Sequence, residues 1–518
     1  MKLSTGNPTP KSVRCKTPWY IAHGIQMGNV VSYLGLPYAQ ATSQEQRFSR
    51  AKRLQASAVD RDASRYGAIA VQHHHIEFPQ LFGWLKSDSP MSENCLTLNV
   101  YAPEPTAEKH PVVVYFHGGS FSHGASSAPC LNGARLAQSQ QVVVVTVNHR
   151  LNVFGYLNAG DEHTDAGFYP NAGLDDLVTS LEWVQDTIAA FGGDARKVTI
   201  MGQSGGAAKV AMLMAMPDAQ GLFHQAIIQS PVNGFLAQSA DQSLEAYERL
   251  CRLLELKSTQ FDALKRVDAS QLLAAHTAVI QEMKGYNAFR PTALEISFGT
   301  NNTALEIQSP VPVMIGVTQT EASFYLLDKI RADCMRLADA AARLQRFLKV
   351  SPDVARGILA GYGEHYAHGV AGLFSQVVGD YLFTCPTLGM IQTLQQTNQP
   401  LYVYQFAMDA NPALPHIGSP HTGELPFIFN QLSLPNSYIT DSEANRRYAQ
   451  QMGDWWGGFI REGRPHASGT DPWQAYNYSG KTMVMREKSV MAKQPDQQAL
   501  VHLDGIAAYF PGNPFNFK

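Results

Sequence analysis

The sequence has few charged residues, and neither sign of charge dominates. There are 40 Lys and Arg against 43 Asp and Glu in 518 residues, so the net charge is −3 and charged residues make up 16% of the chain. Nucleic-acid-binding domains usually carry a basic stripe, and electrostatic membrane anchors carry clustered Lys and Arg. The composition therefore predicts no nucleic-acid partner and no polybasic attachment to a membrane.

Long apolar runs are also absent. None reaches the roughly 18 residues of a membrane-spanning helix, and residues 1–16 (MKLSTGNPTPKSVRCK) lack the apolar centre of a signal peptide. Hydrophobic residues nevertheless make up 45% of the chain, which is too many for a disordered protein. We therefore expect a globular protein of the cytoplasm without a membrane partner. Nothing in the sequence bears on its oligomeric state.

Cysteine is scarce and scattered, with six residues in the chain and no C-x-x-C pair. This pattern disfavours a disulfide scaffold, a zinc ribbon and a thioredoxin-type site. The triplet His73–His75 has no second ligand cluster at a useful spacing, and the chain contains no H-E-x-x-H. We expect reduced thiols, no metal site and no cofactor.

Two short apolar runs indicate the fold class. Residues 111–116 (PVVVYF) and 141–147 (QVVVVTV) are continuous and rich in β-branched residues, which is typical of strands buried on both faces of a parallel sheet. Between the second run and another strand-like segment at 197–201, residues 173–191 carry an apolar stripe at helical spacing. Strand, helix and strand in this order predict a doubly wound α/β sheet.

Later segments read mainly as helices that decorate this sheet. Helical patterns cover about 241–256, 260–284 and 333–361, and the strand-like LYVYQFA at 401–407 returns to the sheet. We expect residues 1–518 to form one large domain with helical insertions at about 235–300 and 330–395.

A candidate nucleophile stands between a strand and a helix. The strand 197–201 runs into Gly202-Gln203-Ser204-Gly205-Gly206, and the helical AAKVAMLMAM follows. The pattern G-x-S-x-G alone occurs by chance in roughly one chain in five of this size. Its strand–turn–helix context is the one in which the glycines permit a sharp turn and the serine hydroxyl projects at a helix N-terminus. We therefore predict Ser204 as a nucleophile.

A glycine-rich turn upstream is a candidate oxyanion hole. The run PVVVYF ends in His117-Gly118-Gly119-Ser120-Phe121, directly after a core strand. Backbone N–H groups in such a turn can donate to a developing oxyanion, and each donor contributes about 2.7–4 kcal/mol to the transition state. A phosphate cradle is disfavoured, because neither G-x-x-x-x-G-K-[ST] nor a G-x-G-x-x-G after a strand occurs.

Several blocks in chain order match one family pattern. Residues 93–100 (ENCLTLNV) match E-D-C-L-x-L-N-V, and residues 148–157 (NHRLNVFGYL) match N-Y-R-L-x-x-x-G-F-L. The most diagnostic stretch is 171–200, which leads into the serine turn, and Trp456 and Trp473 begin segments like the closing W-x-x-F and W-x-x-Y. The chain thus resembles the type-B carboxylesterase/cholinesterase family of α/β-hydrolases from about residue 18 to 510, more loosely after 240.

The resemblance implies the remaining catalytic residues. The family acid lies in G-x-x-x-x-E-[GA], which Gly316-VTQT-Glu321-Ala322 fits, and the family histidine lies in H-x-x-E-[LI]-P, which residues 421–426 (HTGELP) fit. The implied triad is Ser204, Glu321 and His421. His416 is the main competitor for the histidine role.

The resemblance also implies the oxyanion donors, and there the chain departs from the family. The donors fall at Gly119, Ser120 and Gly205. Ser120 replaces a glycine, so we expect a narrower hole that disfavours esters of tertiary alcohols. Gln203 stands where the family usually has Glu, and the missing anion weakens any case for cationic choline esters.

Further expectations follow from the same resemblance. Secreted members pair the E-D-C-L cysteine and a later cysteine in disulfides, but here Ala70 and Ala263 stand at the partner positions, which favours a cytosolic enzyme. The pairs Arg150–Asp176 and Arg47–Glu93 are expected to be structural ion pairs. The candidate substrate-pocket residues are Phe121, Gln203, Phe324 and Phe427.

The sequence thus predicts a serine carboxylesterase that acts on small to medium, mostly neutral esters through an acyl-enzyme on Ser204. One alternative is an acyltransferase, amidase or thioesterase with the same triad. A second is a non-catalytic adhesion-type homologue, although such homologues have lost triad residues that are present here.

Overall fold

The computed structural model describes residues 10–73, 78–160, 163, 167–232, 237–283, 288–293, 306–332, 335–366, 369–493 and 497–506. Three features named above lie at least partly outside these ranges: residues 1–9 of the N-terminal segment, His74 and His75 of the histidine triplet, and parts of both predicted insertions. One of the six cysteines, Cys334, also lies outside them.

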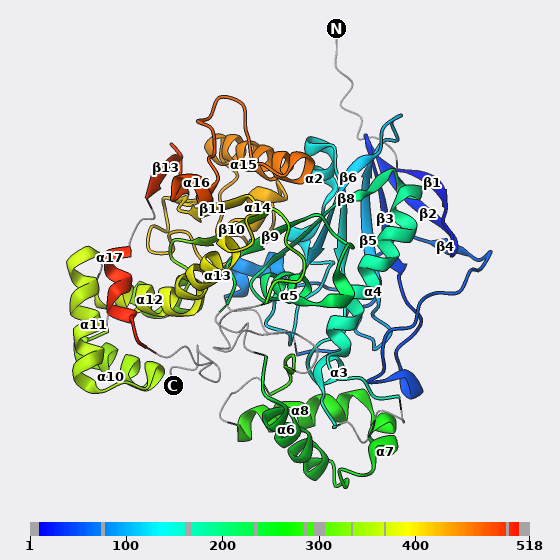
Figure 1. Cartoon of the computed structure of the whole chain (residues 1–518), viewed down its shortest axis with the longest axis horizontal. Helices are drawn as coiled ribbons and strands as arrows, with labels where there is room; N and C mark the ends of the chain where they lie inside the picture. The colour runs from blue at the N-terminus through cyan, green and yellow to red at the C-terminus, as the bar shows by residue number, and fades with distance from the viewer. Residues whose placement is uncertain are drawn as a thin grey trace.

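One mixed sheet of thirteen strands crosses the described part of the chain (Figure 1). Its spatial order is β1-β2-β3-β5-β7-β6-β8-β9-β10-β11-β12-β13, with β4 beside β2. In this order, the strands from β7 to β12 run parallel. The pairs from β1 to β7 and the pair β12–β13 are antiparallel, and β4 pairs in parallel with β2. The strands are β1 (Lys11–Lys16), β2 (Ile21–Met27), β3 (Val30–Pro37), β4 (Asp60–Asp62), β5 (Thr97–Pro103), β6 (His110–Phe116), β7 (Val143–Val147), β8 (Gly193–Gln203), β9 (Gln225–Gln229), β10 (Val313–Thr318), β11 (Leu401–Phe406), β12 (Lys481–Met485) and β13 (Val490–Lys493).

Helices cover the sheet and extend beyond it. They are α1 (Pro79–Phe82), α2 (Ala134–Gln140), α3 (Asn152–Tyr156), α4 (Ala172–Thr187), α5 (Gly205–Ala215), α6 (Ala240–Leu253), α7 (Phe261–Arg266), α8 (Ala269–Glu282), α9 (Ser323–Ala332), α10 (Leu337–Leu348), α11 (Pro352–His365), α12 (Val370–Gly379), α13 (Cys385–Gln395), α14 (Leu425–Ile428), α15 (Glu443–Glu462), α16 (Tyr476–Ser479) and α17 (Gln497–Leu500).

The central strands are buried on both faces, as their composition predicts. Successive side chains of a strand point to opposite faces. In β6, Val112 and Val114 pack in the core cluster that contains α4 and α5, whereas Val113 and Tyr115 pack in the cluster that contains α2 and α15. The α/β fold class predicted from the sequence is therefore confirmed.

The helix predicted at 173–191 is α4, which ends at Thr187 and continues as a single 3₁₀ turn to Phe191. Gly192 then adopts a left-handed conformation with φ 82°. Glycine takes this conformation at little cost, which is why it so often ends a helix.

Two of the three predicted helical segments, 260–284 and 333–361, contain breaks that their apolar pattern does not indicate. Residues 260–284 form α7 and α8, separated at Asp268, whose carboxylate accepts a hydrogen bond from Ser270 N at the start of α8. Residues 335–361 form α10 and part of α11, separated at Ser351, whose hydroxyl caps α11 before Pro352. Helix-capping residues thus decide the boundaries.

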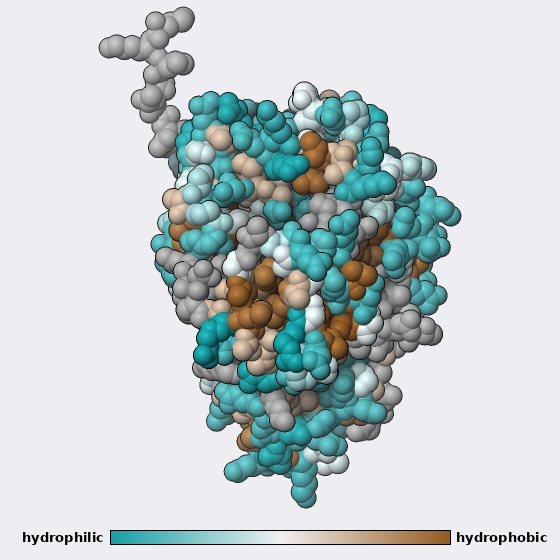
Figure 2. Space-filling model, turned by 90° about the vertical axis from the view of Figure 1, so that its left-hand side faces the viewer, coloured by the Kyte–Doolittle hydropathy of each residue, from teal (hydrophilic) through white to brown (hydrophobic). Residues whose placement is uncertain are grey.

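These helices and their neighbours along the chain form two separate groups (Figure 1). Helices α6, α7 and α8 gather at the lower edge around an apolar cluster shared with α3, and α10, α11 and α12 gather at the left around another. Figure 2 shows this left side of the molecule, where brown apolar groups lie among hydrophilic side chains. The exposed large apolar side chains of the described residues include Leu337 of α10 and Val354 of α11, at 54% and 44%.

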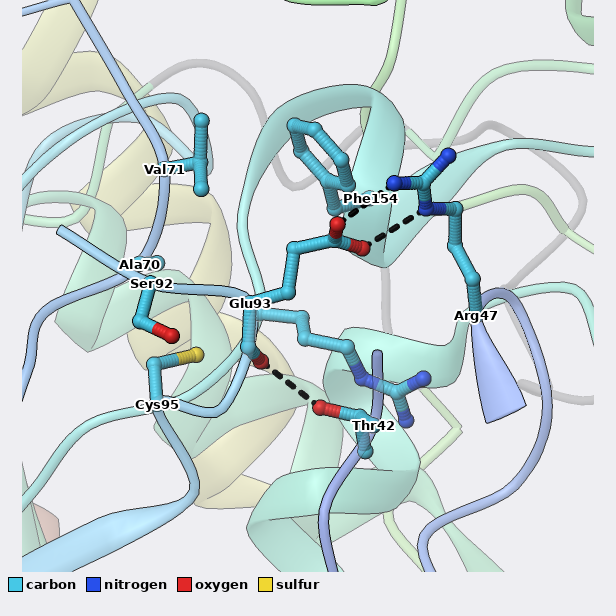
Figure 3. Close-up of a pocket in the computed structure, with 9 residues that line it drawn as sticks. Thr42, Arg47, Ala70, Val71, Ser92, Glu93, Cys95 and Phe154 are labelled. Atoms are coloured by element: carbon cyan, nitrogen blue, oxygen red, sulfur yellow. Dashed lines mark hydrogen bonds and ion pairs between the residues drawn. The ribbon is translucent and has the colours of Figure 1, made fainter. Parts of the chain in front are cut away.

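One buried and one partly buried ion pair hold the framework, as the resemblance implies. Arg150 lies against Asp176 with both side chains buried. Arg47 donates to Glu93 over 2.7 Å, and Figure 3 shows the two side chains joined directly at the wall of a small hollow. None of the predicted site residues lines this hollow. Because its charged lining residues, Arg47, Glu93 and Arg150, are all engaged in these two ion pairs, we assign it to the architecture.

Two further findings concern the thiols and the helices. Five cysteines, at positions 15, 95, 130, 251 and 385, are free, and Cys334 lies outside the described residues. Among the helices that the structure describes, none has both the length and the apolar character needed to cross a bilayer.

Candidate active site

Ser204 occupies a strained turn between β8 and α5. Its backbone has φ 59° and ψ −124°, a region that non-glycine residues rarely adopt. The flanking glycines are needed for the close approach of the chain: a Cβ on Gly202 would lie 2.3 Å from the Gly206 carbonyl oxygen, and a Cβ on Gly206 would lie 2.0 Å from the Phe116 carbonyl oxygen. Strain of this kind typically persists at functional sites.

Glu321 and His421 follow neighbouring strands at the same edge of the sheet as Ser204. Glu321 comes shortly after β10 and His421 lies in the segment after β11. The two side chains meet, with His421 Nδ1 2.5 Å from Glu321 Oε2. The second carboxylate oxygen of Glu321 accepts a hydrogen bond of 2.7 Å from the backbone N–H of Thr318. His421 is 1% and Glu321 2% exposed, so the pair is held inside the protein.

The other side of the imidazole contacts Gln203 and not the serine. The Gln203 amide nitrogen lies 3.2 Å from His421 Nε2 and 3.4 Å from Nδ1. Among the described residues, no hydrogen bond joins Ser204 Oγ to His421. The amide nitrogen is thus nearly equidistant from the two ring nitrogens, which places it over the face of the imidazole. Within the described ranges, the structure therefore brings His421 together with Glu321 and Gln203, and leaves the Ser204 hydroxyl without a hydrogen bond to the imidazole.

The glycine-rich turn after β6 is strained along three successive residues. Gly119, Ser120 and Phe121 all have positive φ, at 98°, 51° and 64°. The Gly119 N–H donates to no acceptor within the described part of the chain. A Cβ on Gly205 would lie 2.6 Å from the Ser120 nitrogen, so the turn and the start of α5 are in direct contact. The three predicted oxyanion donors are thus neighbours.

Backbone hydrogen bonds to Phe121 and Gly119 hold this turn in place. The Asn152 backbone N–H donates to the Phe121 carbonyl over 2.7 Å, and the N–H groups of Ser122 and His123 both donate to the Gly119 carbonyl. These bonds fix the backbone of residues 119–123 in a compact loop.

Glu424 is a second buried carboxyl group beside the His421–Glu321 pair. It is 0% exposed, and its Oε1 accepts a hydrogen bond of 3.1 Å from Gln229, whereas Oε2 has no partner among the described residues. Burial, reinforced by the nearby charge of Glu321, raises the pKa of Glu424 to about 8. The protein therefore holds two close carboxyl groups in different states, Glu321 paired with His421 and Glu424 protonated at neutral pH.

The proton on Glu424 makes stability depend on pH in a definite direction. Between the usual pKa of 4.5 and the value of about 8, the folded protein keeps a proton that the unfolded chain has released. The free energy of unfolding should therefore fall as pH rises through this window, by up to about 1.4 kcal/mol per pH unit.

A Glu424→Gln variant should lack this part of the loss, because the amide mimics the protonated acid and does not titrate. We expect its thermal unfolding midpoint to decline less with pH than that of the wild type when both are measured across the window. Parallel curves for the two proteins would contradict the assignment of a protonated Glu424.

The candidate pocket residues take different positions. Phe324 is 7% exposed and its ring centre lies 6.2 Å from that of His421. Phe121 packs edge-on against Tyr156. Phe427 is 0% exposed and packs against Phe406 and Tyr448 in the core, a position typical of a structural residue.

Sequence reasoning missed the aromatic ring that, among the described residues, lies nearest to His421. The centre of the Phe383 ring lies 4.5 Å from that of the imidazole. Phe383 belongs to a π-helical turn (Asp380–Thr384) between α12 and α13. Such turns are frequent at functional sites, but a single extra residue within a long helical pattern leaves no signal in the periodicity.

Within the described ranges, no group of three His, Cys, Asp or Glu side chains is placed to hold a metal ion. The chemistry that this site supports is carried by a serine hydroxyl at a helix N-terminus, a carboxylate-bound imidazole and a strained loop of backbone N–H groups. This set suits attack on a carbonyl carbon.

Comparisons with known proteins agree with this chemistry. The profile described as the carboxylesterase family matches residues 21–501. The para-nitrobenzyl esterase of Bacillus subtilis (strain 168) is 28% identical over 495 residues, which cover 92% of this chain and 95% of that protein. Carboxylesterase 3B of Mus musculus is 30% identical over 482 residues, which cover 86% of this chain and 80% of that protein.

Solved structures give the same result for the fold. A thermophilic PNB esterase superposes with a TM-score of 0.79 at 26% identity, covering 95% of this chain and 99% of the other. The carboxylesterase EST55 of Geobacillus stearothermophilus superposes with a TM-score of 0.78 at 26% identity, covering 94% and 99%. The fold is that of the α/β-hydrolases. The chain belongs to the carboxylesterase family and is a carboxylic ester hydrolase.

Proposed function

We propose that this esterase hydrolyses small to medium, mostly neutral esters through an acyl-enzyme on Ser204, with His421 as general base and acid and Glu321 as its orienting carboxylate. The observation that carries the proposal is the buried contact of His421 Nδ1 with Glu321, beside the strained turn that presents Ser204. Gln203 supports the preference for neutral substrates, because it places an amide where an anion would attract a cation.

The reaction begins when Ser204 Oγ comes within hydrogen-bond distance of His421 Nε2. The imidazole then takes the hydroxyl proton as the oxygen attacks the carbonyl carbon. Glu321 keeps the proton on Nδ1 and stabilises the imidazolium that forms. His421 next gives its proton to the leaving alkoxide, and a water molecule repeats the sequence on the acyl-enzyme to release the acid and restore Ser204.

The backbone N–H groups of Gly119, Ser120 and Gly205 hold the oxyanion of each tetrahedral intermediate. The free N–H of Gly119 supports this role, because a donor without an internal partner can turn to the substrate. The first residues of α5 add the partial positive charge of a helix N-terminus.

An active-site label tests the proposal directly. A fluorophosphonate should modify the protein with one equivalent, and peptide mapping should find the adduct on Ser204. Hydrolysis of p-nitrophenyl acetate in buffer should release acetate with a burst of p-nitrophenol of the same stoichiometry. An adduct on another residue, or turnover that survives full labelling, would refute the proposed mechanism.

The serine in the oxyanion loop predicts selectivity against branched alcohols. Ser120 carries a side chain at φ 51°, where an all-glycine loop would leave space. We expect kcat/KM for tert-butyl acetate to fall about 100-fold below that for n-butyl acetate, since small displacements of the reacting carbonyl have effects of this size. A Ser120→Gly variant should reduce the ratio. Equal rates on both esters, measured by acid release, would contradict a narrow hole.

We also propose that the protein works in a reducing compartment such as the cytoplasm. The free cysteines support this, because the buried Cys95 and Cys251 stand where secreted relatives are expected to form disulfides. Determination of the redox state of the thiols in the native protein, by mass-tagging before and after reduction, tests the point.

A further inference from the structure

Lys209 is a fully buried lysine close to the nucleophile turn. It lies in α5, about one helical turn after Ser204, and is 0% exposed. Within the described part of the chain, it forms no ion pair with a carboxylate. Because a buried charge without a counter-ion is costly, an aliphatic residue would be expected at this position of an otherwise apolar helix.

The contacts of Lys209 converge on the oxyanion loop. Its ammonium group donates to the His117 carbonyl over 3.0 Å, and it lies 5.0 Å from the centre of the Phe121 ring. His117 begins the loop and Phe121 ends its strained part. One side chain therefore contacts both ends of the segment that supplies Gly119 and Ser120.

The loop needs such support because its backbone is strained. Each of the residues 119–121 has positive φ, and two of them are not glycine. Strain of this kind costs about 1–3 kcal/mol per residue and persists only where the surroundings over-determine the conformation. Asn152 holds the Phe121 carbonyl from one side, and Lys209 holds His117 and the Phe121 ring from the other.

Two neutral histidines complete the surroundings of this lysine. The rings of His117 and His149 stack with centres 4.6 Å apart and an angle of 13°. Burial, together with the charge of Lys209, lowers the pKa of His117 to about 3 and that of His149 well below its usual value. Burial lowers the pKa of Lys209 itself to about 7. Lys209 is thus the group of this trio that can carry positive charge near neutral pH.

We propose that Lys209 is a positioning residue for ester hydrolysis: by holding the His117 carbonyl and the Phe121 ring, its ammonium group fixes the strained loop whose N–H groups stabilise the oxyanion. The proposal rests on the oxyanion role assigned above to Gly119 and Ser120. It distinguishes Lys209 from an ordinary core residue, because support of this kind acts on the transition state and not on substrate binding.

Two substitutions and one matched control test the proposal. Lys209→Met keeps the apolar stem and removes both donor and charge, whereas Lys209→Gln keeps a donor for the His117 carbonyl without the charge. Lys197→Met removes an exposed lysine from β8 of the same strand–helix unit and serves as the control.

We expect Lys209→Met to lower kcat on p-nitrophenyl acetate by about 10- to 100-fold with KM unchanged, since removing an oxyanion donor outright costs about 10²–10³. The inhibition constant of a trifluoromethyl ketone, whose serine adduct carries an oxyanion, should rise by the same factor. Lys209→Gln should recover part of both losses, and Lys197→Met should match the wild type.

Wild-type kcat and inhibition constant in Lys209→Met would overturn the proposal, and so would losses shared equally by Met and Gln and accompanied by a raised KM. If Lys209→Met does not fold, the same readouts on Lys209→Gln decide. Fluorophosphonate titration of Ser204 in each variant corrects for inactive protein. Failure of the wild type to label at Ser204 would instead refute the proposed function.

Discussion

Replacing Ser204 with alanine is expected to lower kcat on p-nitrophenyl acetate by about 10⁴- to 10⁶-fold and to abolish the burst of p-nitrophenol. The reason lies in the turn between β8 and α5. In the proposed mechanism, the strained turn presents the Ser204 hydroxyl at the edge of the sheet, and alanine would keep the turn while removing the proposed attacking atom. The oxyanion loop and the bound substrate remain, so about 10³–10⁴ of catalysis over water should persist. Stopped-flow measurement of the burst, followed by steady-state rates, checks both expectations.

Ser230 provides a matched control for this experiment. It follows β9, the strand beside β8, at the same edge of the sheet, and its hydroxyl is buried without a partner among the described residues. A Ser230→Ala variant should therefore retain the burst. If Ser204→Ala retained turnover and Ser230→Ala lost it, the nucleophile would be Ser230 and not Ser204.

Local patterns in the sequence predict the elements that depend on few residues. The β-branched runs of β6 and β7 indicate burial on both faces, because alternate side chains of each strand must enter different apolar clusters. The nucleophile turn is equally local, since Gly202 and Gly206 are required by contacts within a few residues and with the adjoining strand.

Contacts between side chains that are far apart in the sequence could not be predicted from local patterns. His421 and Glu321 are 100 positions apart, and only the resemblance to a family distinguishes His421 among 17 histidines. Gln203 was predicted as a pocket residue, but its contact with the imidazole depends on how the segment after β11 folds back over β8. No spacing in the sequence encodes that approach.

Burial is a second property of the site that the sequence does not predict. Glu424 and Lys209 read as an acid in a family pattern and a lysine in a helix, and their altered pKa values arise only because tertiary packing removes water from both. Phe427 and Phe383 show the same limit for aromatic rings. Phe427 is near His421 in sequence but packs in the core, whereas Phe383 comes from a distant π-helical turn and lies against the imidazole.

The two buried carboxyl groups near His421 should respond very differently to loss of charge. Glu321→Gln is expected to lower kcat by about 10³- to 10⁴-fold, since an amide can donate to Nδ1 and stabilise the wrong imidazole tautomer, and since it cannot balance the imidazolium. The Thr318 N–H still finds an acceptor in the amide oxygen, so the fold should survive. Steady-state kinetics and the rate of fluorophosphonate labelling should fall together, because both require His421 to activate Ser204.

Glu424→Gln is the matched control, because the same substitution is made at a carboxyl group that is already protonated near neutral pH. The amide can accept from Gln229 as Glu424 does, and it leaves the His421–Glu321 pair untouched. We therefore expect this variant to keep most of the wild-type kcat. A loss as large as that of Glu321→Gln would mean that the negative charge at the site resides on Glu424 as well. Wild-type activity in Glu321→Gln would mean that the carboxylate bound to Nδ1 has no part in the reaction.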